Sequence, residues 1–179
     1  DHFFHTPSND FVVVNYKNIY PPNKFCTVTW VDGNDQAYKI LFIGEAQQDA
    51  RVAAQSDGIL IANFDSLNSF NVFKLDWSGD TLWSKTHNLP HDVFFDMVST
   101  RDGGSCLLSR SSTNTSMPLL IRMDSLGNIL WANTYVGGGF TIKAADLIEN
   151  KKEEFVVEYG LNVAESPGTF LFVRKDGTF

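Results

Sequence analysis

Short runs of alternating apolar and polar residues, each followed by a turn sequence, make up most of this 179-residue chain. Side chains of a strand point to opposite faces in turn, so the alternation predicts strands that bury one face. The apolar clusters are short and interrupted by Gly, Asp, Asn or Pro, so no long helix is predicted. From residue 50 onward the predicted strands are Ala50–Gln55, Ile59–Phe64, Asn71–Asp76, Thr81–Thr86, Phe94–Ser99, Ser105–Ser109, Pro118–Asp124, Ile129–Tyr135, Ile142–Glu149, Glu154–Tyr159 and Thr169–Lys175.

One stretch of this pattern occurs twice. Val72–Trp83 reads VFKLDWSGDTLW, and Leu120–Trp131, 48 residues later, reads LIRMDSLGNILW. In both copies an apolar strand leads into Asp-x-x-Gly, whose Asp can accept backbone N–H groups and whose Gly supplies a positive φ. The same spacing inside matching strands indicates duplication of a two-stranded unit. The repeated positions are Asp76, Gly79, Trp83, Asp124, Gly127 and Trp131.

The first third of the chain is less regular. Residues 1–9 are predicted to be a loosely held lead-in, and Pro21-Pro22 to lie in a polar turn. The hairpin around Gly33 is interpreted as a degenerate copy of the repeat, with Tyr38 near the position of the Trp. The predicted strands here are Phe11–Asn15, Phe25–Asp32 and Ala37–Ile43.

The pattern Asp-x-x-Gly-x-x-x-Trp after an apolar strand resembles the blade repeat of pyrroloquinoline-quinone-type bacterial β-propellers. It is more similar still to the repeats of secreted Bacteroidetes propeller proteins, with Asp57-Gly58 and Asp102-Gly103-Gly104 at the matching upstream positions. The resemblance covers Ala50 to Thr178. It implies an all-β, β-propeller-like array of four-stranded antiparallel blades, in which the Trp packs against the neighbouring blade. It implies no activity, because only the structural repeat is present.

The predicted strands group into approximate blades of residues 10–45, 46–91, 92–139 and 140–179 in a single propeller domain or propeller fragment. Two arrangements are open. Either the chain closes as a small propeller, with Phe11–Asn15 pairing with the apolar strand Thr169–Lys175, or it is part of a larger propeller. In the second case the remainder of that propeller, or a partner, covers the terminal strand.

Composition and net charge limit the classes of binding partner that are expected. The formal net charge of −7 and the pI near 4.9 disfavour nucleic acid and anionic membrane surfaces as partners. No apolar stretch approaches the roughly 20 residues that span a bilayer, so no membrane insertion is expected. The start at Asp1, without initiator Met or signal peptide, is expected of a mature or trimmed form. Cys26 and Cys106 either stay separate buried thiols, the favoured interpretation, or form a disulfide.

Little in the sequence points to catalysis. His87 and His91 have a spacing that suits a metal site on a helix, but Pro90 lies between them, and we interpret them as solvated loop histidines. Residues 137–139, a run of three Gly, are interpreted as a blade connector because a phosphate-binding loop needs a following helix. We predict no catalytic, cofactor-binding or metal-binding residues, and no cofactor.

Two kinds of modification motif are present. Asn114-Thr115-Ser116 is a formal N-glycosylation sequon. Three Asp-Ser/Thr-Leu triplets resemble the O-glycan signal of exported Bacteroidetes proteins, although such triplets also occur in ordinary turns. The candidate acceptors are Asn114, Ser66, Thr81 and Ser125.

Two functional hypotheses follow. The first is a non-enzymatic module of a secreted or cell-surface protein, which binds a protein or glycan through loops on one face or serves as a spacer. The alternative is a propeller enzyme that acts on polysaccharide, or a quinoprotein-like oxidoreductase. The alternative requires converging acids, or a metal and cofactor, in one site.

Overall fold

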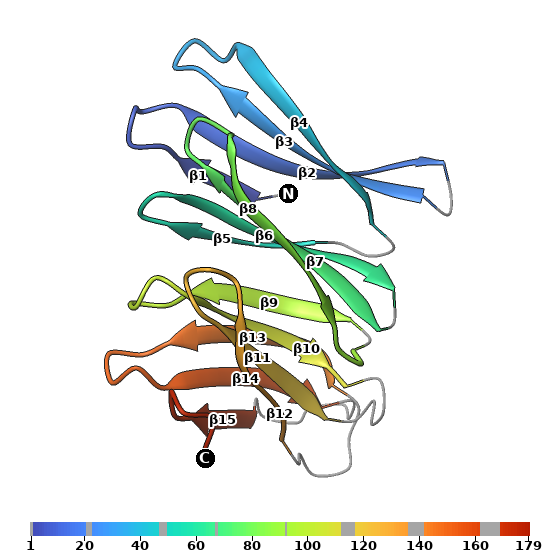
Figure 1. Cartoon of the computed structure of the whole chain (residues 1–179), viewed down its shortest axis with the longest axis vertical. Coiled ribbons are helices and arrows are strands. Elements are labelled where there is room, and N and C mark those ends of the chain that lie inside the picture. The colour runs from blue at the N-terminus through green and yellow to red at the C-terminus, as the bar shows by residue number, and fades with distance from the viewer. Residues whose placement is uncertain are drawn as a thin grey trace. The chain divides into compact units, whose positions relative to one another are not determined.

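The computed structural model describes residues 2–20, 23–46, 50–66, 68–91, 93–111, 117–135, 142–161 and 169–179. All regular secondary structure in these ranges is β-strand, and every pairing is antiparallel (Figure 1). The described part of the chain therefore contains no helix long and apolar enough to cross a membrane.

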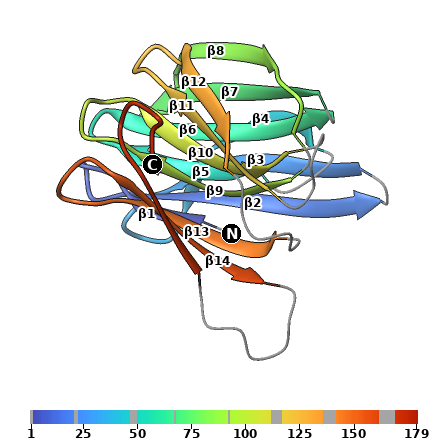
Figure 2. The same ribbon diagram turned by 90° about the horizontal axis from the view of Figure 1, so that it is seen from below.

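The strands form four sheets, and within each sheet the strands that follow one another in sequence lie side by side (Figures 1 and 2). This is the predicted all-β, blade-like architecture. Sheet A contains β1 (His2–His5), β2 (Phe11–Tyr20), β3 (Asn23–Val31) and β4 (Ala37–Ala46); sheet B contains β5 (Arg51–Gln55), β6 (Gly58–Ser66), β7 (Ser69–Asp76) and β8 (Thr81–Asn88). Sheet C contains β9 (Phe94–Ser99), β10 (Ser105–Arg110), β11 (Pro118–Met123) and β12 (Ile129–Thr134); sheet D contains β13 (Ile142–Glu149), β14 (Phe155–Leu161) and β15 (Thr169–Val173).

The chain divides into two compact units. The N-unit, Asp1–Asn88, contains sheets A and B, and the C-unit, Leu89–Phe179, contains sheets C and D. Each unit has its own hydrophobic core, in which one face of the first sheet packs against one face of the second. The N-unit core comprises Val12, Val14, Cys26, Val28 and Trp30 of sheet A with Ala50, Val52, Ile59, Ile61 and Leu75. The C-unit core comprises Cys106, Leu108, Leu120 and Tyr135 with Leu147, Phe155, Val157 and Val173 of sheet D.

The N-terminal region differs from the prediction. His2–His5 is not a loose lead-in but strand β1, paired with β2 in the register His5↔Phe11, His2↔Val14. Its alternating half-buried and exposed residues fit an edge strand. Strand β2 also extends beyond Asn15 to Tyr20, so the polar turn begins later than predicted.

The same pairing rules out one predicted contact. Strand β2 lies between β1 and β3, and its residues from Phe11 to Asn15 are bonded to β3 across their whole length. A strand with neighbours on both sides has no edge left for another strand. The predicted pairing of Phe11–Asn15 with Thr169–Lys175 is therefore wrong.

One turn geometry recurs at hairpin ends throughout the described residues. The first residue donates its N–H to the carbonyl of the fifth and accepts the N–H of the fourth, and the fourth has a positive φ. This is a tight turn closed by a left-handed residue, the geometry that favours Gly in short hairpin loops. The turns are Thr6–Asp10, Asp32–Gln36, Asp76–Asp80, Thr100–Gly104, Asp124–Asn128, Asn150–Glu154 and Arg174–Thr178.

Candidate functional site

The Asp residues of the repeat hold these turns closed. Asp76 Oδ1 accepts hydrogen bonds from the Ser78 hydroxyl at 2.7 Å and the Asp80 N–H at 2.8 Å. These bonds favour the charged carboxylate, and they lower the pKa of Asp76. In the second copy, Asp124 Oδ1 accepts the backbone N–H groups of residues 126 and 128. Gly79 and Gly127 stand at the positive-φ position of the two turns, at φ 84° and 75°.

Two residues before each repeat Asp lies a buried cation. Lys74 is 6% exposed, and its ammonium contacts the Asp57 carboxylate at 2.8 Å. Arg122 is 1% exposed, and its guanidinium contacts the Asp102 carboxylate at 2.5 Å. Both acids lie in the turn between the first two strands of the same sheet, where the sequence places Asp-Gly. A buried charge needs such a partner, so the upstream Asp-Gly and the repeat are two parts of one contact.

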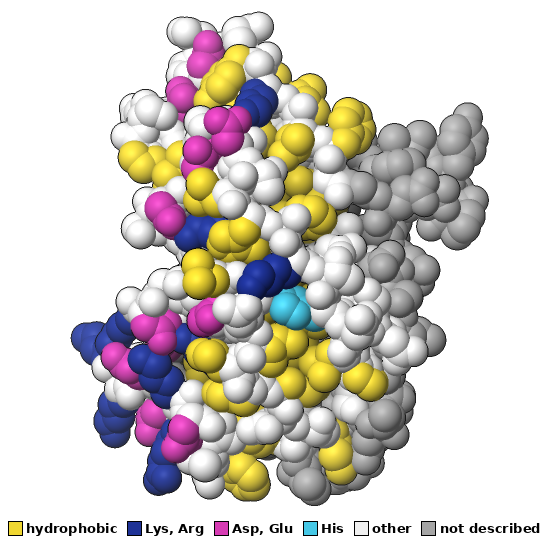
Figure 3. Space-filling view, viewed as in Figure 1, with side chains coloured by type: hydrophobic (Ala, Val, Ile, Leu, Met, Phe, Trp, Pro, Cys, Tyr) yellow, Lys and Arg dark blue, Asp and Glu magenta, His cyan; other side chains and the backbone are white. Residues whose placement is uncertain are grey.

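Asp102 is the centre of a larger network in the C-unit. The Thr100 hydroxyl lies 2.6 Å from its Oδ1, and Lys175 bridges Asp102 at 3.2 Å and Glu153 at 2.8 Å. Partial burial alone raises the pKa of Asp102, but the hydrogen bonds from Thr100 and Arg122 outweigh it and hold that pKa well below its usual range. Figure 3 shows acidic and basic side chains interspersed over the turns of this unit.

The repeat Trp of the C-unit links sheet C to sheet D. Trp131 is the cross-strand neighbour of Arg122, and its indole N–H donates to the Lys175 carbonyl at 2.9 Å. Its ring meets Phe155 edge to face at 6.0 Å. A Cβ at Gly177 would lie 3.1 Å from the indole, so Gly177 allows the close approach. Trp131 is partly buried, as is Trp83, the cross-strand neighbour of Lys74.

In sheet A of the N-unit the Trp and the cation have exchanged strands. Trp30 lies on β3, where Lys74 and Arg122 stand in their sheets, and its cross-strand neighbour is Lys39 of β4. The Trp30 indole is fully buried and donates to the Trp77 carbonyl at 2.9 Å. Lys39 lies over the Trp30 ring at 5.6 Å.

This exchange corrects the sequence interpretation of sheet A. Tyr38 does not stand at the Trp position, which Lys39 occupies, seven residues after Asp32. Tyr38 is 55% exposed, and its hydroxyl bonds Asp10 at 3.1 Å. The signal in the sequence was Trp30, two residues before Asp32, at the place of a cation in the other copies.

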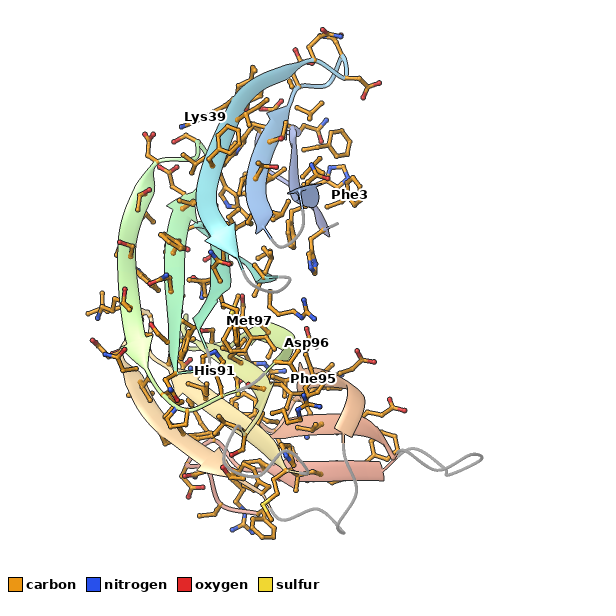
Figure 4. All side chains as sticks on the ribbon, turned by 90° about the vertical axis from the view of Figure 1, so that its right-hand side faces the viewer. Phe3, Lys39, His91, Phe95, Asp96 and Met97 are labelled. Atoms are coloured by element: carbon orange, nitrogen blue, oxygen red, sulfur yellow. The ribbon has the colours of Figure 1, made fainter. Side chains whose placement is uncertain are left out.

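The histidines are not solvated loop residues. His91 is fully buried, its Nδ1 lies 2.7 Å from the Leu89 carbonyl, and its ring stacks on Phe94 at 4.8 Å. Figure 4 labels it together with Phe95, Asp96 and Met97 of β9. His87 belongs to strand β8 and contacts Phe70. Within the described ranges, no group of three or more His, Cys, Asp or Glu residues could hold a metal ion.

Cys26 and Cys106 are buried free thiols, each on a strand inside the core of its own unit. Burial raises the pKa of Cys26 to about 12, and it raises the pKa of Cys106 as well. Both thiols are thus held in the neutral form, which is the form of an inert core residue.

An open depression of about 440 Å³ lies at the end of the C-unit. The Tyr135 hydroxyl donates to the Gly177 carbonyl at 2.8 Å, and the Asn133 amide also donates to it, at 3.2 Å. Burial raises the pKa of Tyr135, so its hydroxyl stays protonated. Phe179 stands edge-on to Tyr135 at 5.6 Å and is 80% exposed. The lining residues are Ala132, Asn133, Thr134, Tyr135, Gly177, Thr178 and Phe179.

Two of the candidate glycosylation residues have described side chains. Thr81, at the start of β8, and Ser125, in the turn before β12, are both exposed. Ser66 ends strand β6, and its side chain is outside the described part. Asn114 and residues 137–139 lie outside the described residues.

No protein-family model and no curated protein matches the chain. Among solved structures, it is similar to a GH43 β-propeller glycoside hydrolase whose engineered active site gives both endo-xylanase and exo-arabinofuranosidase activity. The identity is 13% and the TM-score 0.54, and the match covers 98% of this chain and 38% of that chain. This chain thus spans less than half the length of that enzyme. The likeness establishes a propeller-type fold and no more.

Proposed function

We propose that this chain is a non-enzymatic β-propeller module of a secreted or cell-surface protein, and that it binds a glycan. The observation that carries the proposal is the use of the acids of the repeat. Asp76 and Asp124 close turns, while Asp57 and Asp102 neutralise buried cations. Carboxylates committed in this way build a scaffold, and rigid scaffolds place binding residues on their loops and ends.

The depression beside Tyr135 supports a glycan as the ligand. An exposed aromatic ring, Phe179, lines it together with the polar residues Asn133 and Thr178. Binding sites commonly combine aromatic surface with a few polar groups that fix the orientation of the ligand. The site is open and shallow, which suits an extended chain of sugar rings better than a small enclosed ligand.

The experiment is a glycan-array screen followed by calorimetric titration with the best oligosaccharide. We expect Phe179→Ala to abolish measurable binding, whereas Phe170→Ala, which removes an exposed aromatic of another surface, leaves it unchanged. Equal loss in both variants, or binding only to a protein partner, would contradict the assignment of this site.

A second candidate is a glycoside hydrolase. The similarity to the GH43 enzyme favours it, since that protein acts on xylan and arabinofuranoside bonds. A reducing-sugar assay on arabinoxylan and related polysaccharides separates the two candidates. We expect no turnover, and any turnover above a heat-treated control would overturn the non-enzymatic proposal.

The secreted or cell-surface location rests on the Asp-Thr-Leu and Asp-Ser-Leu triplets, in which Thr81 and Ser125 are exposed and accessible to a glycosyltransferase. Intact-mass analysis of the native protein tests this. Hexose-sized additions lost in the double variant Thr81→Ala, Ser125→Ala are expected, and an unmodified mass would remove this support.

A further inference from the structure

Each unit leaves one apolar sheet face exposed. The open face of sheet A carries Phe3, Tyr38, Ile40 and Phe42, which are 55–69% exposed, and the open face of sheet D carries Ile148, Phe170 and Phe172, which are 55–58% exposed. The register Phe3↔Val13↔Thr29↔Ile40 places Phe3 and Ile40 in one row across the four strands of sheet A, and Tyr38 and Phe42 flank Ile40 along β4 on the same face. Figure 4 shows Phe3 on the side of sheet A away from sheet B. Contiguous apolar surface of this kind marks an interaction site.

The two open faces are opposite halves of one type of contact. In each unit the first sheet packs on the second with the face that carries Trp30 or Trp131, which we call the docking face. The second sheet is contacted on the face opposite to its own docking face, which we call the receiving face. The open face of sheet A is a receiving face, since its docking face is already packed on sheet B. The open face of sheet D is a docking face, since its receiving face is already packed on sheet C.

Sheet D carries the matching docking groups. Phe172 stands two residues before the turn Arg174–Thr178, the place that Trp30 occupies before Asp32. Asp146 stands four residues before the turn at Asn150. In sheet C the residue at that place is Asp96, whose Oδ2 accepts the Leu147 N–H of sheet D at 2.8 Å. Asp146 is exposed on the open face.

Sheet A carries the matching receiving groups. Leu147 lies three residues before its turn, and the residue at that place in sheet A is Phe3. Where Gly79 and Gly177 make room for an indole, the turn of sheet A has Asp35, with a positive φ and a Cβ. A phenyl ring is shorter than an indole, so Phe172 suits a turn with this Cβ better than a Trp would.

We propose that the open face of sheet D binds the open face of sheet A of a second copy of this chain, head to tail. Phe172 then packs beside the turn Asp32–Gln36, and Asp146 accepts the backbone N–H of Phe3. One chain carries both halves of a contact that it forms twice within itself, which is why a second copy is the occupant. Because the two faces differ, the contact is heterologous, and it continues from copy to copy unless the ring closes.

The exposed apolar surface is large enough for such a contact. Large apolar side chains present roughly 150–250 Å² each, so the seven side chains, all more than half exposed, leave on the order of 800 Å² uncovered. A specific interface buries about 1,200–2,000 Å² in total, so the apolar part alone supplies about half. The smaller residues of the same two faces, such as Val13 and Val156, add to it.

Sedimentation velocity across a wide concentration range tests the proposal. We expect the wild-type chain to form oligomers that dissociate on dilution. Phe42→Asp blocks the face of sheet A and Phe172→Asp that of sheet D, so each variant alone is monomeric. Mixed together they form a one-to-one heterodimer that grows no further, because each variant keeps one intact face. Leu126→Asp, at an exposed turn residue of sheet C, is the matched control and assembles as the wild type does.

Ile40→Thr and Phe170→Thr serve as a second pair, since Thr is compatible with a strand, and circular dichroism checks that every variant is folded. A wild-type chain that stays monomeric at all concentrations overturns the proposal, and the faces are then covered by other polypeptide. A mixture of the two folded Asp variants that remains monomeric also overturns it.

Discussion

The two units form the same hydrogen bond between their sheets with a Trp that lies on different strands. In the C-unit the indole comes from the fourth strand of the sheet, at Trp131, and in the N-unit from the third strand, at Trp30. In both, the indole N–H donates to the carbonyl of the second turn residue of the next sheet, Trp77 or Lys175, at 2.9 Å. In both, a Gly with positive φ lies beneath the ring.

The partners of the cation change with this exchange. Arg122, on the third strand, is buried and pairs with Asp102 of its own sheet, whereas Lys39, on the fourth strand, reaches Asp80 of the next sheet at 3.1 Å. The Lys39 side chain is 34% exposed, against 1% for Arg122. The comparison teaches that the contact between two sheets depends on the position of the indole against the turn of the next sheet, not on the strand that carries the Trp. The cation lies on whichever of the third and fourth strands does not carry the Trp.

The largest expected effect comes from removing the buried indole. Trp30→Ala should destabilise the N-unit by about 3–5 kcal/mol, the range for large aromatic truncations in cores. Trp131→Ala should cost less, because Trp131 is only partly buried. Urea denaturation monitored by fluorescence of the remaining Trp residues measures both. Equal costs would show that burial of the ring does not distinguish the two contacts.

The second prediction concerns the cations. Arg122→Met should destabilise the C-unit by about 2–4 kcal/mol, because it leaves Asp102 without its buried partner and two backbone carbonyls, of Ser105 and Met123, without a donor. Lys39→Met should cost less than about 1 kcal/mol, as for exposed ion pairs. Thermal unfolding of the two variants side by side provides the measurement. A larger loss for Lys39→Met would reverse the comparison.

These two contacts also show how far the sequence could lead. The strands of sheets B to D were predicted within a few residues, because the alternation and the Asp-x-x-Gly turn recur together there. The exchange of Trp30 and Lys39 was missed, because the pattern Asp-x-x-Gly-x-x-x-Trp requires the Trp to follow the turn, whereas Trp30 precedes it. Strand β1 was missed because HFFH has no alternation until its pairing with β2 is known. The burial of His91 depends on stacking with Phe94 in the folded unit, and no local pattern reveals it.

The turn glycines offer a smaller effect with an internal control. At Gly79 a Cβ would lie 2.6 Å from Trp30, and φ is +84°, so Gly79→Ala should destabilise the N-unit by about 1–3 kcal/mol through strain and displacement of the ring. At Gly33 nothing lies within 4 Å of a Cβ, and Gly33→Ala should change stability by less than about 0.5 kcal/mol. Matched thermal melts of the two variants decide this. Similar losses would mean that neither the positive φ nor the neighbouring indole makes a Cβ at Gly79 costly.

The smallest expected effect is on the pH dependence of the stability of the C-unit. The pKa of Asp102 is lowered in the folded state. The stabilisation by the Asp102 carboxylate is therefore complete above the pKa of an unfolded Asp, about 3.9, and is lost as the pH falls below that pKa. Between neutral pH and about pH 3 the wild-type C-unit should therefore lose more stability than Asp102→Asn does. Urea midpoints at the two pH values measure the difference. An acid dependence that is the same in Asp102→Asn would remove Asp102 as its source.

Hydrogen exchange of the indole N–H groups, followed by ¹H–¹⁵N NMR, tests the central claim most directly, because the docked indole is what joins one sheet to the next. The chain has four Trp residues, so each indole signal can be assigned by single substitution. The account predicts strong protection for Trp30, whose fully buried N–H is bonded to the Trp77 carbonyl, and weaker but clear protection for Trp131. An indole N–H of Trp30 that exchanges as fast as that of a free tryptophan would contradict it.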